Sequence, residues 1–423
     1  MTAHPPAAGP ARPYYGWPML ACLSAAETLS WGVLYYSFAV FVRPIEQETG
    51  WSRAQVTGAF SAALLASGLA AVPVGRWLDA HGARGLMTAG AAAGALLLAA
   101  LAGVSSLPAL YAVWIGLGVV MAAVLYEPAF AVVATWFVRR RDRALTILTV
   151  SAGLASTLVV PLTTWLVAAY GWRRAALGLA ALLACTTVPL HGLTLRRSPA
   201  AVGQHPDGDL VPPDTAPIAV RPAAASDPRL WAFTGALTLV SLVTVAATVH
   251  LVPYLVGEGS TPARAASTVG LIGVMQLPGR LAFGRARRAF AWPSLAAAVF
   301  LLQAAALAML AGTTGDAPLA AFAVLFGVGN GMATLLRAST LAELAGPDRY
   351  GSTGGVVSLF TTLGRAAGPL LASLAYVASG SYRAVLAGMV ALLVAAATLV
   401  LAAARPRGSA ERDSSALAHG LGG

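Results

Sequence analysis

The sequence contains no lysine, and this absence excludes several classes of protein at once. All 27 basic residues of the 423-residue chain are arginine. A Walker-type phosphate loop, a Schiff-base enzyme and a pyridoxal site each require a lysine side chain. We therefore expect no enzyme activity, no cofactor and no step driven by ATP.

Cysteine and charge are scarce as well. The only cysteines, Cys22 and Cys185, lie far apart inside apolar stretches, so neither a disulfide framework nor a metal site is indicated. Charged residues make up 10% of the chain, against about 25% in a soluble domain. Hydrophobic residues make up 58%, and the mean hydropathy is +0.73. This composition is typical of an integral membrane protein.

Long apolar runs fill most of the chain, and each is about long enough to cross a bilayer as a helix, which takes ~20 residues. The two halves look duplicated, because each has a run with a glycine and a proline followed by a glycine, aromatic, arginine turn. We predict an all-α membrane protein with twelve transmembrane helices in two pseudo-symmetric six-helix bundles. The expected spans are 16–42, 54–75, 86–104, 108–138, 145–169 and 174–195, then 230–256, 264–284, 291–311, 317–345, 351–378 and 383–404.

The spans divide the chain into five regions. The connector between the bundles is rich in proline, aspartate and alanine and has no apolar period, so we expect it to be flexible. The predicted regions are an N-terminal tail (1–15), an N-terminal bundle (16–195), a linker (196–229), a C-terminal bundle (230–404) and a C-terminal tail (405–423).

Arginine placement predicts the orientation in the membrane. With both termini in the cytoplasm, eighteen arginines fall on the cytoplasmic side, six fall outside and three fall within spans. This excess follows the positive-inside rule. We expect a multi-pass protein of the cell membrane with both termini and the linker cytoplasmic.

A charged turn is predicted between the second and third spans, from Gly75 to Arg84. Its spacing of Gly75, Asp79, Gly82 and Arg84 resembles the signature loop of the major facilitator superfamily. The resemblance extends over nearly the whole chain. Segments similar to the monocarboxylate and oxalate/formate porter branch are Tyr15-Gly16-Trp17, Gly50-Trp51-Ser52-Arg53, Trp136-Phe137 with Arg139-Arg140-Arg141, and Gly171-Trp172-Arg173.

The resemblance implies the major facilitator fold and a gating role for this turn. A carboxylate at Asp79 can cap the positive N-terminus of a helix in the other half, such as the span that begins at Gly351-Ser352-Thr353. In the family this contact is expected to close the cytoplasmic side while the cavity opens outward. Gly75, Gly82 and Arg84 complete the predicted gating group.

Charged residues within spans are the best candidates for function, because each costs ~2.5–3.5 kcal/mol in lipid unless it meets a partner or water. Glu27 and Glu127 lie near mid-membrane and are candidates for proton coupling. Each is alternatively a structural carboxylate. Arg365 and Arg337 are candidates to bind an anionic substrate, since a guanidinium grips a carboxylate with two hydrogen bonds.

Other polar residues receive weaker interpretations. Tyr126, beside Glu127, and Asn330, within a glycine-rich stretch, are further candidates for substrate binding. Tyr35, Tyr36 and Trp31 either line a central cavity between the bundles or serve as interfacial or packing aromatics. Arg337 has an alternative partner in Glu343 or in the acids of the first half. Arg280, near the cytoplasmic end of its span, is expected to extend to the membrane surface.

Together these features favour a secondary transporter that works by alternating access. We expect it to move a small organic solute, preferably a carboxylate anion, with a proton or by exchange, and to function as a monomer without nucleic acid. An efflux pump for drugs or natural products is an alternative on the same fold. A membrane sensor that does not transport is an alternative of another class.

Overall fold

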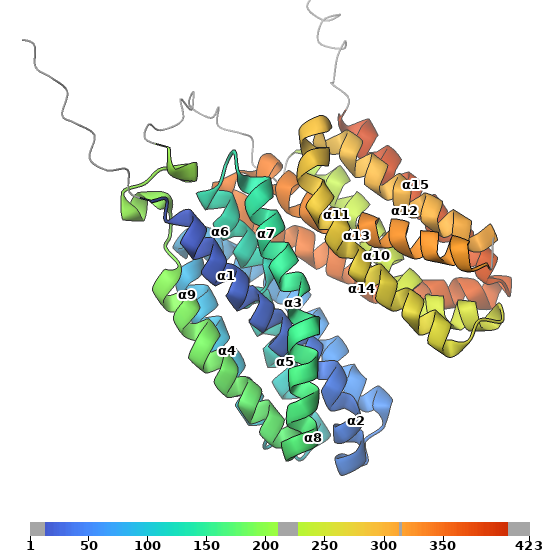
Figure 1. Ribbon diagram of the computed structural model, residues 1–423, viewed down its shortest axis with the longest axis horizontal. Helices are drawn as coiled ribbons and strands as arrows, with labels where there is room; N and C mark the ends of the chain where they lie inside the picture. The colour runs from blue at the N-terminus through green and yellow to red at the C-terminus, as the bar shows by residue number, and fades with distance from the viewer. Residues whose placement is uncertain (1–12, 210–226, 313–314, 405–423) are drawn as a thin grey trace, which may run out of the picture.

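The computed structural model describes residues 13–209, 227–312 and 315–404, which form helices and no strand. The helices gather into an N-terminal and a C-terminal half, blue to green and yellow to red in Figure 1. The predicted tails beyond these ranges, at 1–12 and 405–423, and linker residues 210–226 lie outside the described residues.

Six helical rods build the N-terminal half, and several are assembled from two or three segments. The segments are α1 (Gly16–Ser30), the π-helix η1 (Trp31–Tyr36), α2 (Ser37–Thr49), α3 (Arg53–His81), α4 (Ala83–Leu101), α5 (Leu107–Val124), α6 (Tyr126–Trp136), α7 (Arg141–Gly153), α8 (Ala155–Leu182), the π-helix η2 (Leu183–Thr187) and α9 (Val188–Thr194).

Six rods also build the C-terminal half, after the short 3₁₀ turns η3 (Pro199–Val202) and η4 (Pro206–Gly208). These rods are α10 (Pro228–Gly257), α11 (Pro262–Ala289), α12 (Trp292–Gly312), α13 (Asp316–Ala345), α14 (Tyr350–Ser379), preceded by the 3₁₀ turn η6 (Pro347–Arg349), and α15 (Tyr382–Ala404). The all-helical two-bundle fold predicted from the sequence is confirmed.

Local sequence explains where these helices begin and end. The Ser52 hydroxyl accepts a hydrogen bond from the backbone N–H of Gln55, and the Gln55 side-chain oxygen accepts one from the backbone N–H of Ser52, so a capping box starts α3. The Thr261 hydroxyl accepts a hydrogen bond from the backbone N–H of Arg264 and caps the start of α11. Gly171, at φ +78°, breaks α8 into the fifth and sixth rods, because only glycine adopts this conformation without strain.

The predicted turn from Gly75 to Arg84 is wrong in its extent. Helix α3 continues to His81, and only Gly82, at φ +81°, reverses the chain before α4 begins at Ala83. Between Gly75 and Gly82 no proline or glycine interrupts the helix, so the polar residues of the last turns remain helical at the membrane surface.

The predicted flexibility of the linker is wrong for its first part. Asp207 accepts hydrogen bonds from the backbone N–H groups of Val138, Arg139 and Arg140, at 3.1, 2.7 and 3.2 Å. These groups lie in the turn between α6 and α7, directly before α7 begins at Arg141, where a carboxylate complements the N–H groups near the helix start. Residues up to Asp209 are therefore fixed to the N-terminal half.

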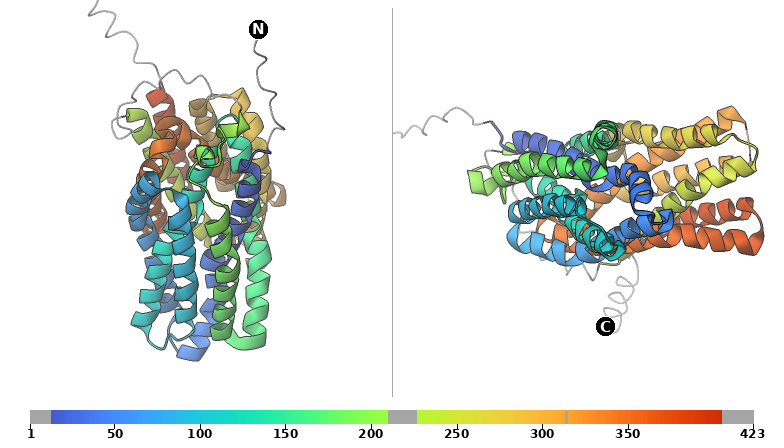
Figure 2. Two further views of the ribbon diagram at one scale, coloured as in Figure 1. Left: turned by 90° about the vertical axis from the view of Figure 1, so that its left-hand side faces the viewer. Right: turned by 90° about the horizontal axis from the view of Figure 1, so that it is seen from below.

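The two halves meet near the end of the molecule where Tyr14, Arg196 and Pro228 lie, here called the linker end. They splay apart toward the opposite end, here called the open end (Figures 1 and 2). Glycines allow α3 and α14 to touch backbone to backbone, since a Cβ on Gly75 would lie 2.0 Å from the Gly351 carbonyl oxygen. Small residues make such close helix packing possible in membranes.

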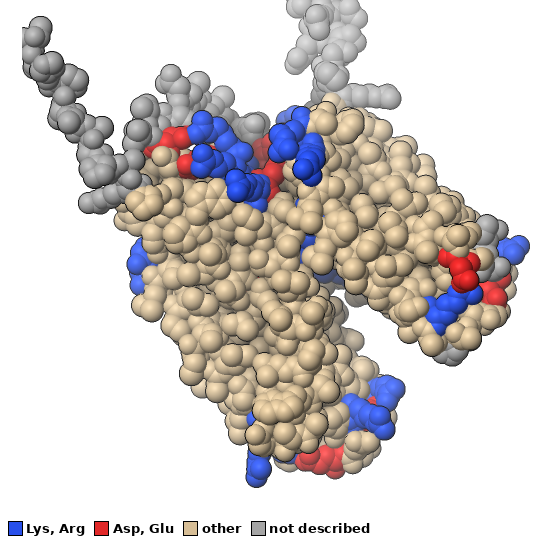
Figure 3. Space-filling view, in the orientation of Figure 1, with Lys and Arg blue, Asp and Glu red and all other residues tan. Residues whose placement is uncertain are grey.

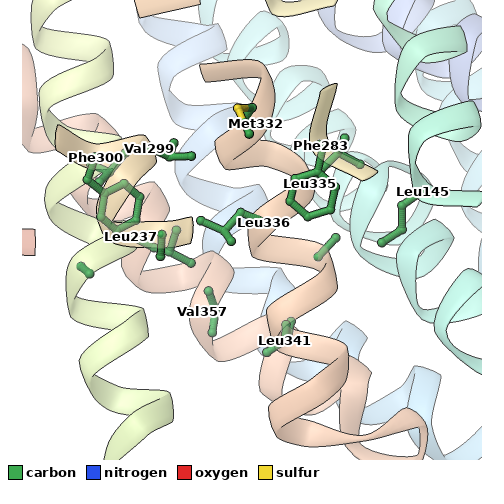
Figure 4. Packing of buried hydrophobic residues seen from close by; sticks show 14 of the residues in the cluster. Leu145, Leu237, Phe283, Val299, Phe300, Met332, Leu335, Leu336, Leu341 and Val357 are labelled. Carbon is green, nitrogen blue, oxygen red and sulfur yellow. The ribbon is translucent and has the colours of Figure 1, made fainter. Parts of the chain in front are cut away.

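A continuous apolar core fills the C-terminal half and reaches into the other half. Figure 4 shows Phe283 of α11 between Leu335 of α13 and Leu145 of α7. All three side chains are at most 1% exposed. The core therefore crosses between the halves where α7 packs on α11.

The outer surface of the helices is apolar, as expected in lipid. Leu96 and Val377 are 72% and 81% exposed, for example. Among the described residues, nine helical stretches are long and apolar enough to span a membrane, and one of these, Arg141–Thr194, contains the break at Gly171. Arginine side chains gather at the linker end (Figure 3).

The packing of α3 on α5 gives a stability prediction. A Cβ on Gly118 would lie 2.0 Å from the Ala63 carbonyl oxygen, so Gly118→Ala should separate the two helices and destabilise the protein by about 1–3 kcal/mol. Gly388→Ala in α15 is the matched control, because no atom lies within 4 Å of its Cβ position. Thermal denaturation in detergent should show a lower midpoint for the first variant alone; equal midpoints would contradict the close packing.

Candidate functional site

A cleft separates the two halves. In Figure 3 it is open at one end and narrows toward the linker end. Three predicted site residues lie at or near its base, namely Glu127 on α6, Arg337 on α13 and Arg365 on α14. Within the described ranges, no group of three or more His, Cys, Asp or Glu side chains gathers in a way that would hold a metal ion.

Glu127 and Arg337 form an ion pair that joins the halves. The Arg337 guanidinium donates to one carboxylate oxygen of Glu127, and both side chains are less than 20% exposed. The other oxygen has no hydrogen-bond partner among the described residues and lies 3.2 Å from the Cβ position of Gly354 on α14. Glu127 reaches this place because the chain bends at Leu125 between α5 and α6. Of the two alternative partners predicted for Arg337, the acid of the first half is the correct one.

Arg365 continues the row of α14 residues that faces α3. Gly351, Gly355 and Thr362 in this row touch α3, and Arg365 follows Thr362 by three residues, on the same face of the helix. Its side chain is exposed, and it interacts electrostatically with Arg337 and with Tyr35 and Glu127 of the other half. Within the described part of the chain, it forms no hydrogen bond or ion pair. It is therefore a free guanidinium on the cleft wall.

The prediction that Arg280 extends to the membrane surface is wrong. Arg280 is 7% exposed and donates to the backbone oxygen of Thr149 on α7 at 2.5 Å and to Gln276 at 3.3 Å. Gly153 leaves room for the guanidinium, since its Cβ would lie 2.7 Å away. Arg280 thus bridges α11 and α7, and its burial between the halves was not visible in the sequence.

Glu27 and Tyr126 lie in the N-terminal half beside the cleft. Glu27 is fully buried on α1, and neither carboxylate oxygen has a hydrogen-bond partner among the described residues. Tyr126 opens α6, with its ring 4.8 Å from that of Trp31 and stacked on Phe130 at 4.9 Å. The hydroxyl of Tyr126 interacts electrostatically with Glu27 and Arg280.

Asn330 has a different setting. Its amide oxygen accepts hydrogen bonds from Gln303 of α12 at 2.6 Å and from Thr244 of α10 at 3.4 Å. Gln303 is fully buried. The polar group of Asn330 is thus engaged between helices of the C-terminal half.

The predicted gating residues divide between two contacts. Asp79 accepts hydrogen bonds from the backbone N–H groups of Gly351 and Ser352, both at 2.7 Å, and so caps α14 from the other half. Gly75 permits the backbone contact beside it. Arg84, after the turn at Gly82, donates to the Gly192 oxygen at 2.8 Å and ties α4 to α9 within one half.

A second contact joins the two halves at the linker end, and it was not predicted from the sequence. The Ser339 hydroxyl of α13 donates to Asp142 of α7 at 2.7 Å. Asp142 lies in an arginine-rich turn, where its charge is easily taken for a surface ion pair. The signal that would have found it is a lone acid among Arg139, Arg140, Arg141 and Arg143.

The chain belongs to the Major Facilitator Superfamily, because a sequence profile of that family matches residues 20–366. It is accordingly a membrane transporter. Monocarboxylate transporter 11 of Mus musculus is 30% identical over 394 residues, which cover 90% of this chain and 85% of that protein. Monocarboxylate transporter 13 of Bos taurus is 28% identical over 275 residues, which cover 62% of this chain and only 60% of the relative's length.

Solved structures with the same fold are more distant in sequence. FucP, the E. coli fucose:proton symporter, has in its outward conformation a TM-score of 0.71 at 14% identity, with 93% of this chain and 100% of that chain covered. The human organic anion transporter MFSD10 has a TM-score of 0.64 at 18% identity, with 92% and 97% covered. At these identities the likeness concerns the fold alone.

Proposed function

We propose that this transporter moves a monocarboxylate anion together with a proton. The observation that carries the proposal is Arg365, an exposed guanidinium without a partner among the described residues, beside the Arg337–Glu127 pair at the cleft. A guanidinium binds a carboxylate through two parallel hydrogen bonds. The names of the curated relatives, which are monocarboxylate transporters, support the same class of substrate.

The ion pair supplies a means of coupling. As long as Glu127 is ionised, it occupies the Arg337 guanidinium. A proton on Glu127 removes that competitor, so Arg337 becomes able to share the substrate carboxylate with Arg365. Proton uptake then favours anion binding, because a neutral Glu127 leaves the Arg337 charge unpaired and the substrate carboxylate takes its place. Glu27, buried without a hydrogen-bond partner among the described residues, is the second candidate to take up a proton.

The direction of access follows from the same geometry. We propose that the linker end faces the cytoplasm, where the excess of arginine belongs. The cleft then opens to the outside, and Asp79 acts as a latch at the N-terminus of α14. Opening inward breaks this contact and the Asp142–Ser339 contact together.

Replacing the free guanidinium tests the substrate class. Arg365→Gln should raise the KM for carboxylate uptake into proteoliposomes by about 10- to 100-fold, since a charge-assisted hydrogen bond contributes about 1.5–3 kcal/mol. Arg288→Gln is the control, because it removes the same charge from an exposed position in the last turn of α11. Indifference of uptake to Arg365→Gln would remove the proposed anion site.

Replacing the acid of the ion pair tests the coupling. Wild-type uptake should increase as the pH on the open side falls, because each substrate anion is proposed to enter with a proton. Glu127→Gln should keep exchange of substrate for substrate but lose its pH dependence and lose accumulation driven by a pH gradient. Exchange and net uptake are both measured in proteoliposomes. A variant that still accumulates substrate down a proton gradient would show that Glu127 does not carry the proton.

Replacing the latch tests the gating role. Asp79→Asn weakens a charged cap, which contributes about 1–2 kcal/mol, so turnover should fall by up to about tenfold while KM changes less than twofold. The exposed Asp348, in the turn before α14, provides the control Asp348→Asn. Turnover equal to wild type in Asp79→Asn would disprove the latch.

A further inference from the structure

An aromatic surface covers the N-terminal side of the cleft region. We call it the aromatic wall, and it consists of Trp31, Tyr35, Tyr36, Phe60 and Tyr126. The centroid of the Trp31 ring lies 4.8 Å from Tyr126, 5.3 Å from Tyr35 and 6.4 Å from Tyr36, and Tyr35 lies 5.3 Å from Phe60. All five side chains are only partly buried. The wall is therefore a continuous set of rings that retains accessible surface.

The π-helix η1 assembles the central part of this wall. Trp31 and Tyr36 begin and end η1, five residues apart, which is the spacing of a π-helical turn. In a regular helix Tyr36 would point well away from Trp31, whereas here the centroids of these two rings lie 6.4 Å apart. The rings of Tyr35 and Tyr36 are 5.2 Å apart. Such π-segments are frequent at functional sites.

Arginines of the C-terminal half face this wall. Arg280 interacts electrostatically with the hydroxyls of Tyr36 and Tyr126, and Arg365 interacts with that of Tyr35. Neither guanidinium lies over a ring of the aromatic wall. The cation–π contacts among the described residues are those of Arg143 with Trp17 and of Arg173 with Trp172. The indole N–H of Trp31 lies close to the buried Glu27 carboxylate.

One side of the site is thus aromatic, with its rings tilted or edge-on to one another, and the other side is cationic. A ligand that matches both has a planar aromatic body and a carboxylate. Stacking against the rings adds to the favourable burial of the ligand's apolar surface. A carboxylate of two or three carbons has no group to place against the wall.

We propose that the preferred substrate is an aromatic monocarboxylate, with its ring against the aromatic wall and its carboxylate at Arg365. This inference rests on the proposed carboxylate transport and specifies the substrate within it. Trp31 and Tyr126 are then the residues that set specificity, because their rings meet where η1 and α6 come together.

A matched pair of substrates tests the inference. Pyruvate and phenylpyruvate differ only by a phenyl group, so counterflow in proteoliposomes with each acid isolates the effect of the ring. The KM for phenylpyruvate should be at least about tenfold lower than that for pyruvate. Trp31→Leu and Tyr126→Leu should each raise the phenylpyruvate KM about tenfold and leave the pyruvate KM within twofold, whereas Trp31→Phe should retain the preference.

The control is Trp77→Leu, since Trp77 is 53% exposed and stacks on His81 at the linker end of α3. It should change neither KM. Equal KM values for the two acids in the wild type, or equal loss of both in Trp31→Leu, would overturn the aromatic specificity and leave carboxylate transport intact. A protein that moves neither acid, with or without Arg365→Gln, would instead contradict the proposed function itself.

Discussion

The structure depends on the cost of charge inside a membrane. Glu127 and Arg337 lie far from both ends of their rods, and each carries a charge that lipid does not solvate. They meet across the two halves as an ion pair whose side chains are less than 20% exposed. The same cost leaves Arg365 exposed in the cleft rather than among the helices. The proposed substrate site is built on these groups.

Closure at the linker end is the second constraint. Glycines bring α3 and α14 into backbone contact, so the halves fit closely there and separate elsewhere. Asp79 then reaches two N–H groups at the start of α14, and Asp142 accepts from Ser339 nearby. Each of these contacts is a few hydrogen bonds in strength, which suits the proposed opening and closing of this interface.

Much of the fold was predictable, because apolar length alone defines membrane helices. The Asp79 cap was also predictable, from the family spacing and the helix that begins at Gly351. The sequence did not reveal that α3 continues to His81, that Asp207 fixes the first part of the linker, or that Arg280 is buried. These features depend on neighbours distant in sequence, which composition and periodicity do not contain. Asn330 illustrates the same limit, since its partners Gln303 and Thr244 come from two other helices.

In the proposed mechanism one proton accompanies one carboxylate anion, so that no net charge crosses the membrane. Uptake into proteoliposomes, measured under an imposed membrane potential and separately under an imposed pH gradient, tests this coupling. We expect uptake to follow the pH gradient and not to respond to the potential. Uptake driven by the potential alone, with no response to pH, would show that the anion crosses without a proton and would contradict the exchange of partners between Glu127 and the substrate.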